Sequence, residues 1–442
     1  MPTDTPNEVD GPARRPPSGR HLGSRAIDRT LDRWVVLAAV VASIAFLAAA
    51  VLALLLPTSV RRGLWLPLHL ALAGGATTAI VGVMPFFVAA FATAPPAGTG
   101  VRAVSVAAVA LGAVAVTLGV AGSASTLAVL GGVGFVSGIV LAGIATVRPL
   151  VGALGPSRGL VTRAYVAALA MVGLGATIAT LSLAGWAPIV AAWPQARVAH
   201  AWLNLFGFVS LVIVATLLHL FPTVLGARIT RHPSATVAVG GVGSSAPLVA
   251  LGYWIESDWL VRVGALAALT GSLALAVYAT RIWRARARWS SDPGWHRFVI
   301  GGLASTIVWF VVGVVVAAGR AISSGAAIEG WSLDLVAGPL VLGWVGLSIV
   351  ASASHLLPAI GPGDPSSRAR QRRILGVASA GRLAALDAGI AGVAVGESLR
   401  IPVLTALGGV LVGIGFTASA ALIGAAVVAG FRSRSSSRES SS

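Results

Sequence analysis

The chain has 442 residues, of which 56% are hydrophobic and only 10% are charged, whereas an ordinary soluble domain is about 25% charged. All 31 basic residues are arginine, the formal net charge is +17, and there is no cysteine. These values exclude a soluble domain, disulfides, iron–sulfur clusters and cysteine nucleophiles. Because the arginines lie in short clusters between apolar runs, the positive charge indicates membrane topology, and we expect no nucleic-acid partner.

Two polar tails flank a long apolar body. Residues 1–33 are rich in Pro, Arg and Asp and lack the pattern of a cleavable signal peptide. Residues 432–442 are of low complexity, and we expect both tails to be disordered and cytoplasmic. Residues 34–431 form the transmembrane domain, and their composition predicts an all-α polytopic membrane protein with twelve transmembrane helices. The twelve apolar runs lie at about 35–56, 64–93, 103–121, 126–147, 164–186, 200–226, 236–254, 260–282, 298–319, 334–360, 378–397 and 401–430.

The distribution of arginine supports this number of helices. With the N-terminus inside, 25 of the 31 arginines fall in cytoplasmic segments and 6 fall outside. This asymmetry follows the positive-inside rule and predicts that both termini are cytoplasmic. The arginine-only, Ala/Gly/Val-rich composition is typical of a GC-rich bacterial genome, so we expect a multi-pass protein of the bacterial cytoplasmic membrane, with the lipid bilayer as its first partner.

The chain also contains an internal repeat. Residues 343–362 match residues 207–226 at nine of twenty positions, and the prolines Pro85, Pro222 and Pro358 are separated by 137 and 136 residues. Each of these intervals contains four apolar runs. The spacing predicts three pseudo-repeated four-helix units, in which the second, sixth and tenth helices are equivalent.

Two histidines occupy the same position in this repeat. His219 and His355 each lie three residues before the proline of their helix. A histidine inside a bilayer helix is costly enough to need an explanation, and neutral imidazole is a common metal ligand. Under pseudo-threefold symmetry the two rings would face a common centre and hold a metal or a haem. The alternative is a hydrogen bond between helices.

Two further histidines lie toward the other ends of the second and sixth helices. His69 and His200 are candidate haem or copper ligands at that level, and Asn204, one turn after His200, would orient it or bond to a neighbouring helix. Asp387 is the one acidic residue well inside an apolar run. We expect it to form an ion pair with Arg382 rather than to act in a proton relay.

The pattern of three repeated units with histidines on the second, sixth and tenth helices resembles a known family. The segments that carry this resemblance are LHLALAGGATTAIVGVMPFF from Leu68, HAWLNLFGFVSLVIVATLLHLFPTVLG from His200 and GPLVLGWVGLSIVASASHLLPAIG from Gly338. They are similar to subunit I of the haem–copper oxidases, and more closely to the NnrS-type haem–copper membrane proteins. The resemblance implies haem and/or copper, bound by His69, His200, His219 and His355, and a role in nitric-oxide or respiratory stress.

The chain also departs from the oxidases. The oxidases carry two ligand histidines on the tenth helix and a pair on the seventh. This chain has one histidine on the tenth helix and none on the seventh. A proton-pumping, oxygen-reducing centre is therefore not expected, and enzymatic activity stays open. We predict haem or copper binding in nitric-oxide, respiratory or metal homeostasis, with a possible redox partner protein. The alternatives are a cofactor-free secondary transporter or channel and a membrane assembly partner of a redox protein.

Overall fold

The computed structural model describes residues 20–151, 159–229, 232–287, 292–362 and 364–439. These residues form helices and no strands. The first helix begins at Arg20 and the last ends at Glu439, so helical structure reaches into both segments that we predicted to be disordered. The rest of those segments lies outside the described residues.

Eleven helices in the described part of the chain are long and apolar enough to cross a membrane by themselves. A twelfth span is obtained only if α16 and α17, which are bent by 48°, are counted together. The fold is therefore that of a polytopic all-helical membrane protein with eleven or twelve candidate spans. The helices that contain the spans are α1 (Arg20–Ala53), α3–η1–α4 (Trp65–Ala92), α5 (Thr99–Ala121), α6 (Ser125–Val151), α7 (Leu160–Leu183), α9–η2–α10 (Trp193–Val224), α11 (Pro233–Trp254), α12 (Asp258–Arg284), α13 (Pro293–Ser324), α14–η4–α15 (Asp334–Ile360), α16 (Pro365–Leu375) with α17 (Ser379–Leu399), and α18 (Pro402–Glu439). In α1 the span itself is Trp34–Ala53, and in α18 it is Pro402–Phe431.

Three of these spans form the centre of the bundle. In their most apolar stretches, 61% of the residues of α3–η1–α4, 83% of α9–η2–α10 and 72% of α14–η4–α15 are buried. The other eight described spans that qualify by themselves are at or below 50%. These are the second, sixth and tenth helices of the sequence analysis. By these buried fractions, the three equivalent helices of the predicted repeat are the ones most enclosed by the rest of the bundle.

Close helix pairs pack around this centre. The pairs α5–α6, α11–α12 and α17–α18 are in extensive contact, and each contains glycines that let two backbones approach. A Cβ atom at Gly112 would lie 2.6 Å from the backbone nitrogen of Phe135, and one at Gly389 would lie 2.7 Å from that of Val412. Small residues at such contacts are the usual means of packing helices in lipid.

Each central helix leaves α-helical geometry once. The π-helical segments are η1 (Leu70–Ala76), η2 (Leu203–Ser210) and η4 (Ala337–Gly346). Backbone carbonyls displaced from regular bonding must find partners within the protein, because lipid offers none. In η4, the Thr306 hydroxyl is within hydrogen-bonding distance of two carbonyls, those of Gly343 (2.8 Å) and Trp344 (2.7 Å).

A direct hydrogen bond joins two of the π-helical segments. The indole Nε1 of Trp344 in η4 donates to the Ser210 hydroxyl at the end of η2, at 2.9 Å, and both side chains are buried. The centres of the sixth and tenth helices are therefore fixed to one another at this level.

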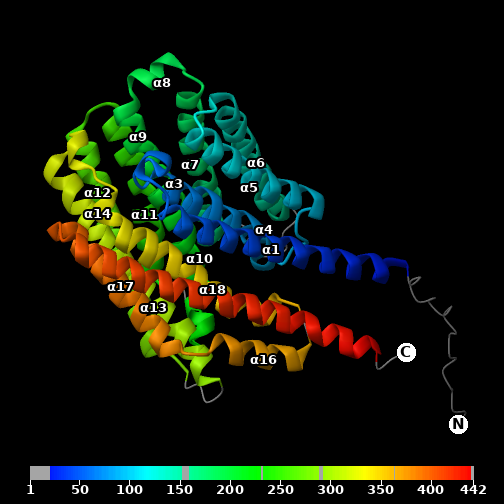
Figure 1. Ribbon diagram of the computed structural model, residues 1–442. Helices are drawn as coiled ribbons and strands as arrows, with labels where there is room; N and C mark the ends of the chain where they lie inside the picture. The colour runs from blue at the N-terminus through cyan, green and yellow to red at the C-terminus, as the bar shows by residue number, and fades with distance from the viewer. Residues whose placement is uncertain (1–19, 152–158, 230–231, 288–291, 363, 440–442) are drawn as a thin grey trace, which may run out of the picture.

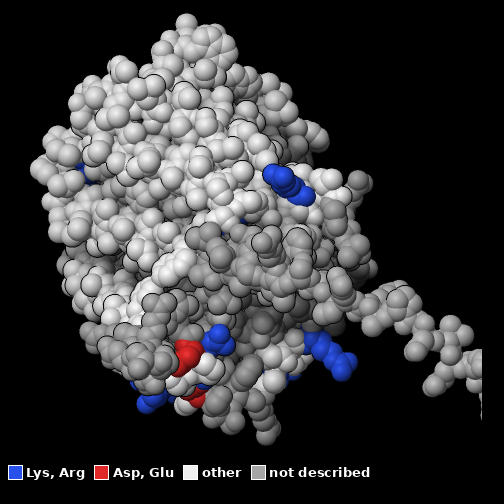
Figure 2. All heavy atoms as spheres, turned by 90° about the vertical axis from the view of Figure 1, so that its right-hand side faces the viewer, with Lys and Arg blue, Asp and Glu red and all other residues white. Residues whose placement is uncertain are grey.

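The first and last spans meet at one end of the bundle. The ring of Trp34 in α1 stacks on that of Phe431 in α18, with ring centres 5.5 Å apart, and Figure 1 shows α1 and α18 running side by side toward that end. In Figure 2 charged atoms gather near the lower edge of the visible face, at the height of α16 in Figure 1, while the face above is almost free of them. An apolar belt with charge gathered toward one end suits a bilayer.

The predicted ion pair between Asp387 and Arg382 is wrong. Asp387 accepts hydrogen bonds from the Ser305 hydroxyl and from the indole nitrogen of Trp309, both on α13. The Arg382 guanidinium lies over the ring of Phe298, 3.8 Å from its centre. Residues five apart on a helix do not face each other as residues three or four apart do, so each side chain finds partners elsewhere.

We predict that Thr306→Ala destabilises the fold. The substitution removes the hydroxyl that bonds to the buried η4 carbonyls, and an unsatisfied buried acceptor costs about 1–3 kcal/mol. The free energy of unfolding in a detergent titration should fall by that amount. Thr280→Ala is the matched control, because the Thr280 hydroxyl bonds to a carbonyl of its own helix at an exposed position. An equal loss in both variants would contradict the role given to Thr306.

Candidate metal-binding site

The structure brings His69 and His200 together. His69 is the last residue of α3 (Trp65–His69), directly before η1, and His200 lies in α9 (Trp193–Trp202), three residues before η2. Their ring centres are 6.3 Å apart and their ring planes differ by 12°. Both side chains are half-buried. The two histidines that the sequence placed at the same level of two equivalent helices are therefore neighbours in space.

Hydrogen bonds fix which nitrogen of each ring is free. Nδ1 of His69 lies 2.7 Å from the carbonyl oxygen of Trp65, and Nδ1 of His200 lies 2.8 Å from that of Gly175. A carbonyl only accepts, so Nδ1 carries the proton in both rings, and Nε2 keeps its lone pair. No hydrogen bond among the described residues uses Nε2 of either ring. This arrangement, with Nδ1–H bonded to a carbonyl, is the one found in metal-ligating histidines.

The surroundings hold each ring in place. The Trp65 ring stacks on His69 with ring centres 4.2 Å apart. The amide nitrogen of Asn204 donates to the His200 carbonyl at 2.7 Å and lies 3.1 Å from Nδ1 of that ring. Asn204 thus lies against the His200 ring and satisfies the His200 carbonyl in α9, but two N–H groups do not bond to each other, so the orienting role stays a prediction.

Gly175 of α7 is a part of the site that the sequence analysis missed. Its carbonyl accepts the His200 proton, and a Cβ atom on it would lie 2.6 Å from the Asn204 amide nitrogen. The space for Asn204 therefore exists because residue 175 has no side chain. Many glycines occur in these helices, so nothing in the sequence singled this one out.

The donor set fits a metal that takes few protein ligands. A metal–imidazole bond is about 2.0–2.1 Å long, so one ion between the rings is compatible with ring centres 6.3 Å apart. Imidazole nitrogen suits copper and iron. The described residues contain no group of three or more His, Asp or Glu side chains that could hold an ion. The pair therefore offers two imidazole nitrogens, which would suit copper or haem iron, and the described residues add no third protein ligand.

The inner histidines have separate surroundings. The ring of His219 packs against Phe91 of α4 with ring centres 4.5 Å apart, and that of His355 stacks on Trp295 of α13 at 5.6 Å. Nδ1 of each ring is buried without a hydrogen-bond partner. No ring contact joins the two histidines in the described structure, and the pocket between α10 and α15 is lined by neither. A shared ligand at this level therefore stays a prediction without support from the geometry.

We predict that Gly175→Ala weakens metal binding. The added methyl group would displace Asn204 and with it the His200 ring, and loss of such an orienting partner typically costs 10- to 100-fold in metal affinity. Titration of the purified protein with copper or haem measures this affinity. Gly173→Ala is the control, because a methyl group there would come no closer than 3.9 Å to a neighbouring side chain. Equal affinities in the two variants would show that Gly175 has no part in the site.

Comparison with known proteins supports a shared fold. No family model and no curated protein sequence matches the chain. Among solved structures, the chain is similar to one described as a heme-copper terminal oxidase dimer determined by cryo-electron microscopy, with a TM-score of 0.60 and 15% sequence identity. The match covers 90% of this chain and 84% of that one. The helices of this chain are thus arranged in a distant haem–copper oxidase-like fold.

Proposed function

We propose that this membrane protein binds copper or haem iron through His69 and His200. The observation that carries the proposal is the pairing of two half-buried imidazoles whose Nδ1 atoms are bonded to carbonyls and whose Nε2 atoms are free. The oxidase-like fold adds support, because the solved structure similar to this chain is that of a heme-copper oxidase. The narrower NnrS-type assignment rests on the sequence resemblance alone.

Each residue of the site has a distinct part in this proposal. His69 and His200 supply the nitrogen ligands, the carbonyls of Trp65 and Gly175 set their tautomers, and Asn204 holds the start of η2. When bound, copper or haem would supply one-electron redox chemistry. The setting that we propose is nitric-oxide or respiratory stress or metal homeostasis in a bacterial cytoplasmic membrane, with a redox protein as partner.

The test is to measure cofactor content and the absorption spectrum of the purified protein and its variants. Protein from cells supplied with copper and a haem precursor should contain about one copper or one haem per chain. A Soret band identifies haem, and elemental analysis identifies copper. His69→Ala and His200→Ala should each lower the affinity at least tenfold, because either change removes one of two protein ligands.

The inner histidines provide the comparison. His219→Ala and His355→Ala should leave the cofactor content unchanged, because their rings pack against Phe91 and Trp295 and lie apart from the outer pair. If the inner variants lose the cofactor and the outer ones keep it, the site is at the inner level. Wild-type protein without copper or haem would refute the proposal at either level.

A further inference from the structure

A pocket lies in the bundle away from the outer histidines. It has a volume of about 150 Å³ and is walled by α1, α4, α7, α10 and α15. Its wall on α10 runs from Val212 to Leu220, whereas His200 lies twelve residues before Val212 in the same span. At a rise of about 1.5 Å per residue, this separation makes the pocket a different site from the histidine pair.

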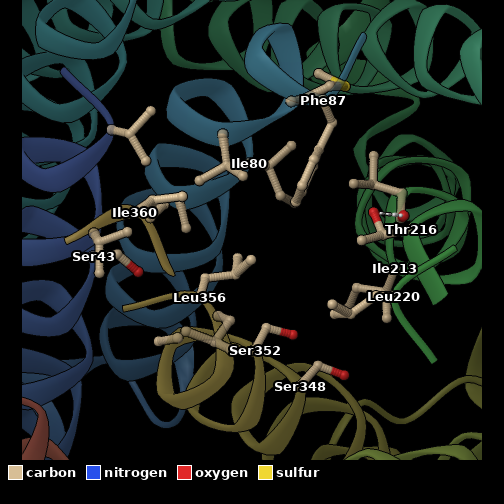
Figure 3. A pocket seen from close by; sticks show the side chains of 18 of the residues that line it. Ser43, Ile80, Phe87, Ile213, Thr216, Leu220, Ser348, Ser352, Leu356 and Ile360 are labelled. Atoms are coloured by element: carbon tan, nitrogen blue, oxygen red, sulfur yellow. Dashed lines mark hydrogen bonds between the residues drawn. The ribbon is translucent and has the colours of Figure 1, made fainter. Parts of the chain in front are cut away.

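The walls of the pocket are apolar apart from a few hydroxyl groups. No charged side chain lines it, and its polar residues are Ser43, Tyr165, Thr216, Ser348 and Ser352. Figure 3 shows these serines and Thr216 spaced around a space that is otherwise bounded by Ile, Leu, Val and Phe side chains. A charged ligand would lose its hydration here without gaining a partner, so the pocket suits an uncharged molecule.

Most of these hydroxyls are already bonded within the protein. The hydroxyls of Tyr165 and Thr216 lie 2.8 Å apart, and Thr216 also donates to the Val212 carbonyl. The Ser348 hydroxyl lies 2.9 Å from that of Thr306. These groups shape the wall of the pocket but have little need of a further partner.

The hydroxyls of Ser43 and Ser352 are the exceptions, and Ser43 is the more deeply buried of the two. Ser43 lines the pocket, its side chain is 1% exposed, and its hydroxyl has no hydrogen-bond partner among the described residues. A serine in a bilayer helix commonly donates to the carbonyl one turn earlier, as Ser137 does to Val133 at 2.8 Å. A buried hydroxyl without a partner is costly, which leaves Ser43 as a donor for a molecule in the pocket.

We propose that the pocket binds a small uncharged molecule with a benzene-sized apolar body and one hydrogen-bond acceptor placed at Ser43. The size follows from the volume, since an engineered cavity of about 150 Å³ in another protein binds benzene or xenon. Water is a poorer occupant, because a buried water needs two to four polar partners and most hydroxyls here are engaged. This site is independent of the metal site, and neither proposal depends on the other.

Photolabelling of the full-length protein in nanodiscs tests the proposal. The probe is 3-trifluoromethyl-3-phenyldiazirine, which is benzene-sized and reacts on illumination, and mass spectrometry locates its adducts. Labelling of the pocket segments of α1, α4, α10 and α15 should saturate. Benzaldehyde should compete about fivefold more strongly than benzene, because its carbonyl accepts a bond from Ser43 and one neutral hydrogen bond is worth a few-fold in affinity.

Three variants make the outcome decisive. Ser43→Ala should leave labelling saturable but remove the advantage of benzaldehyde, whereas Ser137→Ala, an exposed serine outside the pocket, should retain it. Ala79→Leu fills the pocket and should abolish saturable labelling. The proposal is overturned if labelling rises without saturation, as on lipid-facing helix surfaces, or if it survives Ala79→Leu. It is overturned equally if benzaldehyde keeps its advantage in Ser43→Ala.

Discussion

Inside a bilayer every backbone carbonyl must be satisfied by the protein itself, and this constraint is most demanding at the centre of the bundle. The three most buried helices each contain a π-helical segment, η1, η2 and η4, in which the regular bonding is disturbed. Side chains take over the carbonyls: Thr77 bonds to Leu72, Asn204 to His200, and Thr306 to two carbonyls of η4. The polar side chains of Thr77, Asn204 and Thr306 in this core are explained by the need to satisfy these carbonyls.

The candidate metal site lies next to two of these π-helical segments. π-Helical turns are rare and occur often at functional sites, and here both outer histidines lie just before one. The carbonyls of Trp65 in α3 and Gly175 in α7 fix the two Nδ1 atoms, and the amide of Asn204 lies at the start of η2. The rings are thereby held in one tautomer and one orientation with Nε2 free, which is the preparation that a metal ligand needs. Gly175 completes it by leaving room for Asn204.

The membrane spans and the three central helices could be predicted from the sequence, because they depend on hydrophobic composition and on the spacing of the internal repeat. Apolar length located the spans, and the repeat selected the three helices that form the core. By itself, α17 is not apolar enough to count as a membrane span, since it carries Arg382, Asp387 and Glu397. The rotation of each helix about its axis depends on packing that spacing along one chain does not encode. His219 and His355 are equivalent in sequence, yet one packs on Phe91 and the other on Trp295.

The central claim is that His69 and His200 share one metal. X-ray absorption at the metal edge of the loaded, full-length protein tests it most directly, because scattering from imidazole rings reports how many are bound to the metal. The account predicts two imidazole nitrogens per metal at about 2.0–2.1 Å in the wild type and in His219→Ala, and one in His200→Ala. A spectrum that shows two imidazoles after the loss of His200, or none in the wild type, would contradict it.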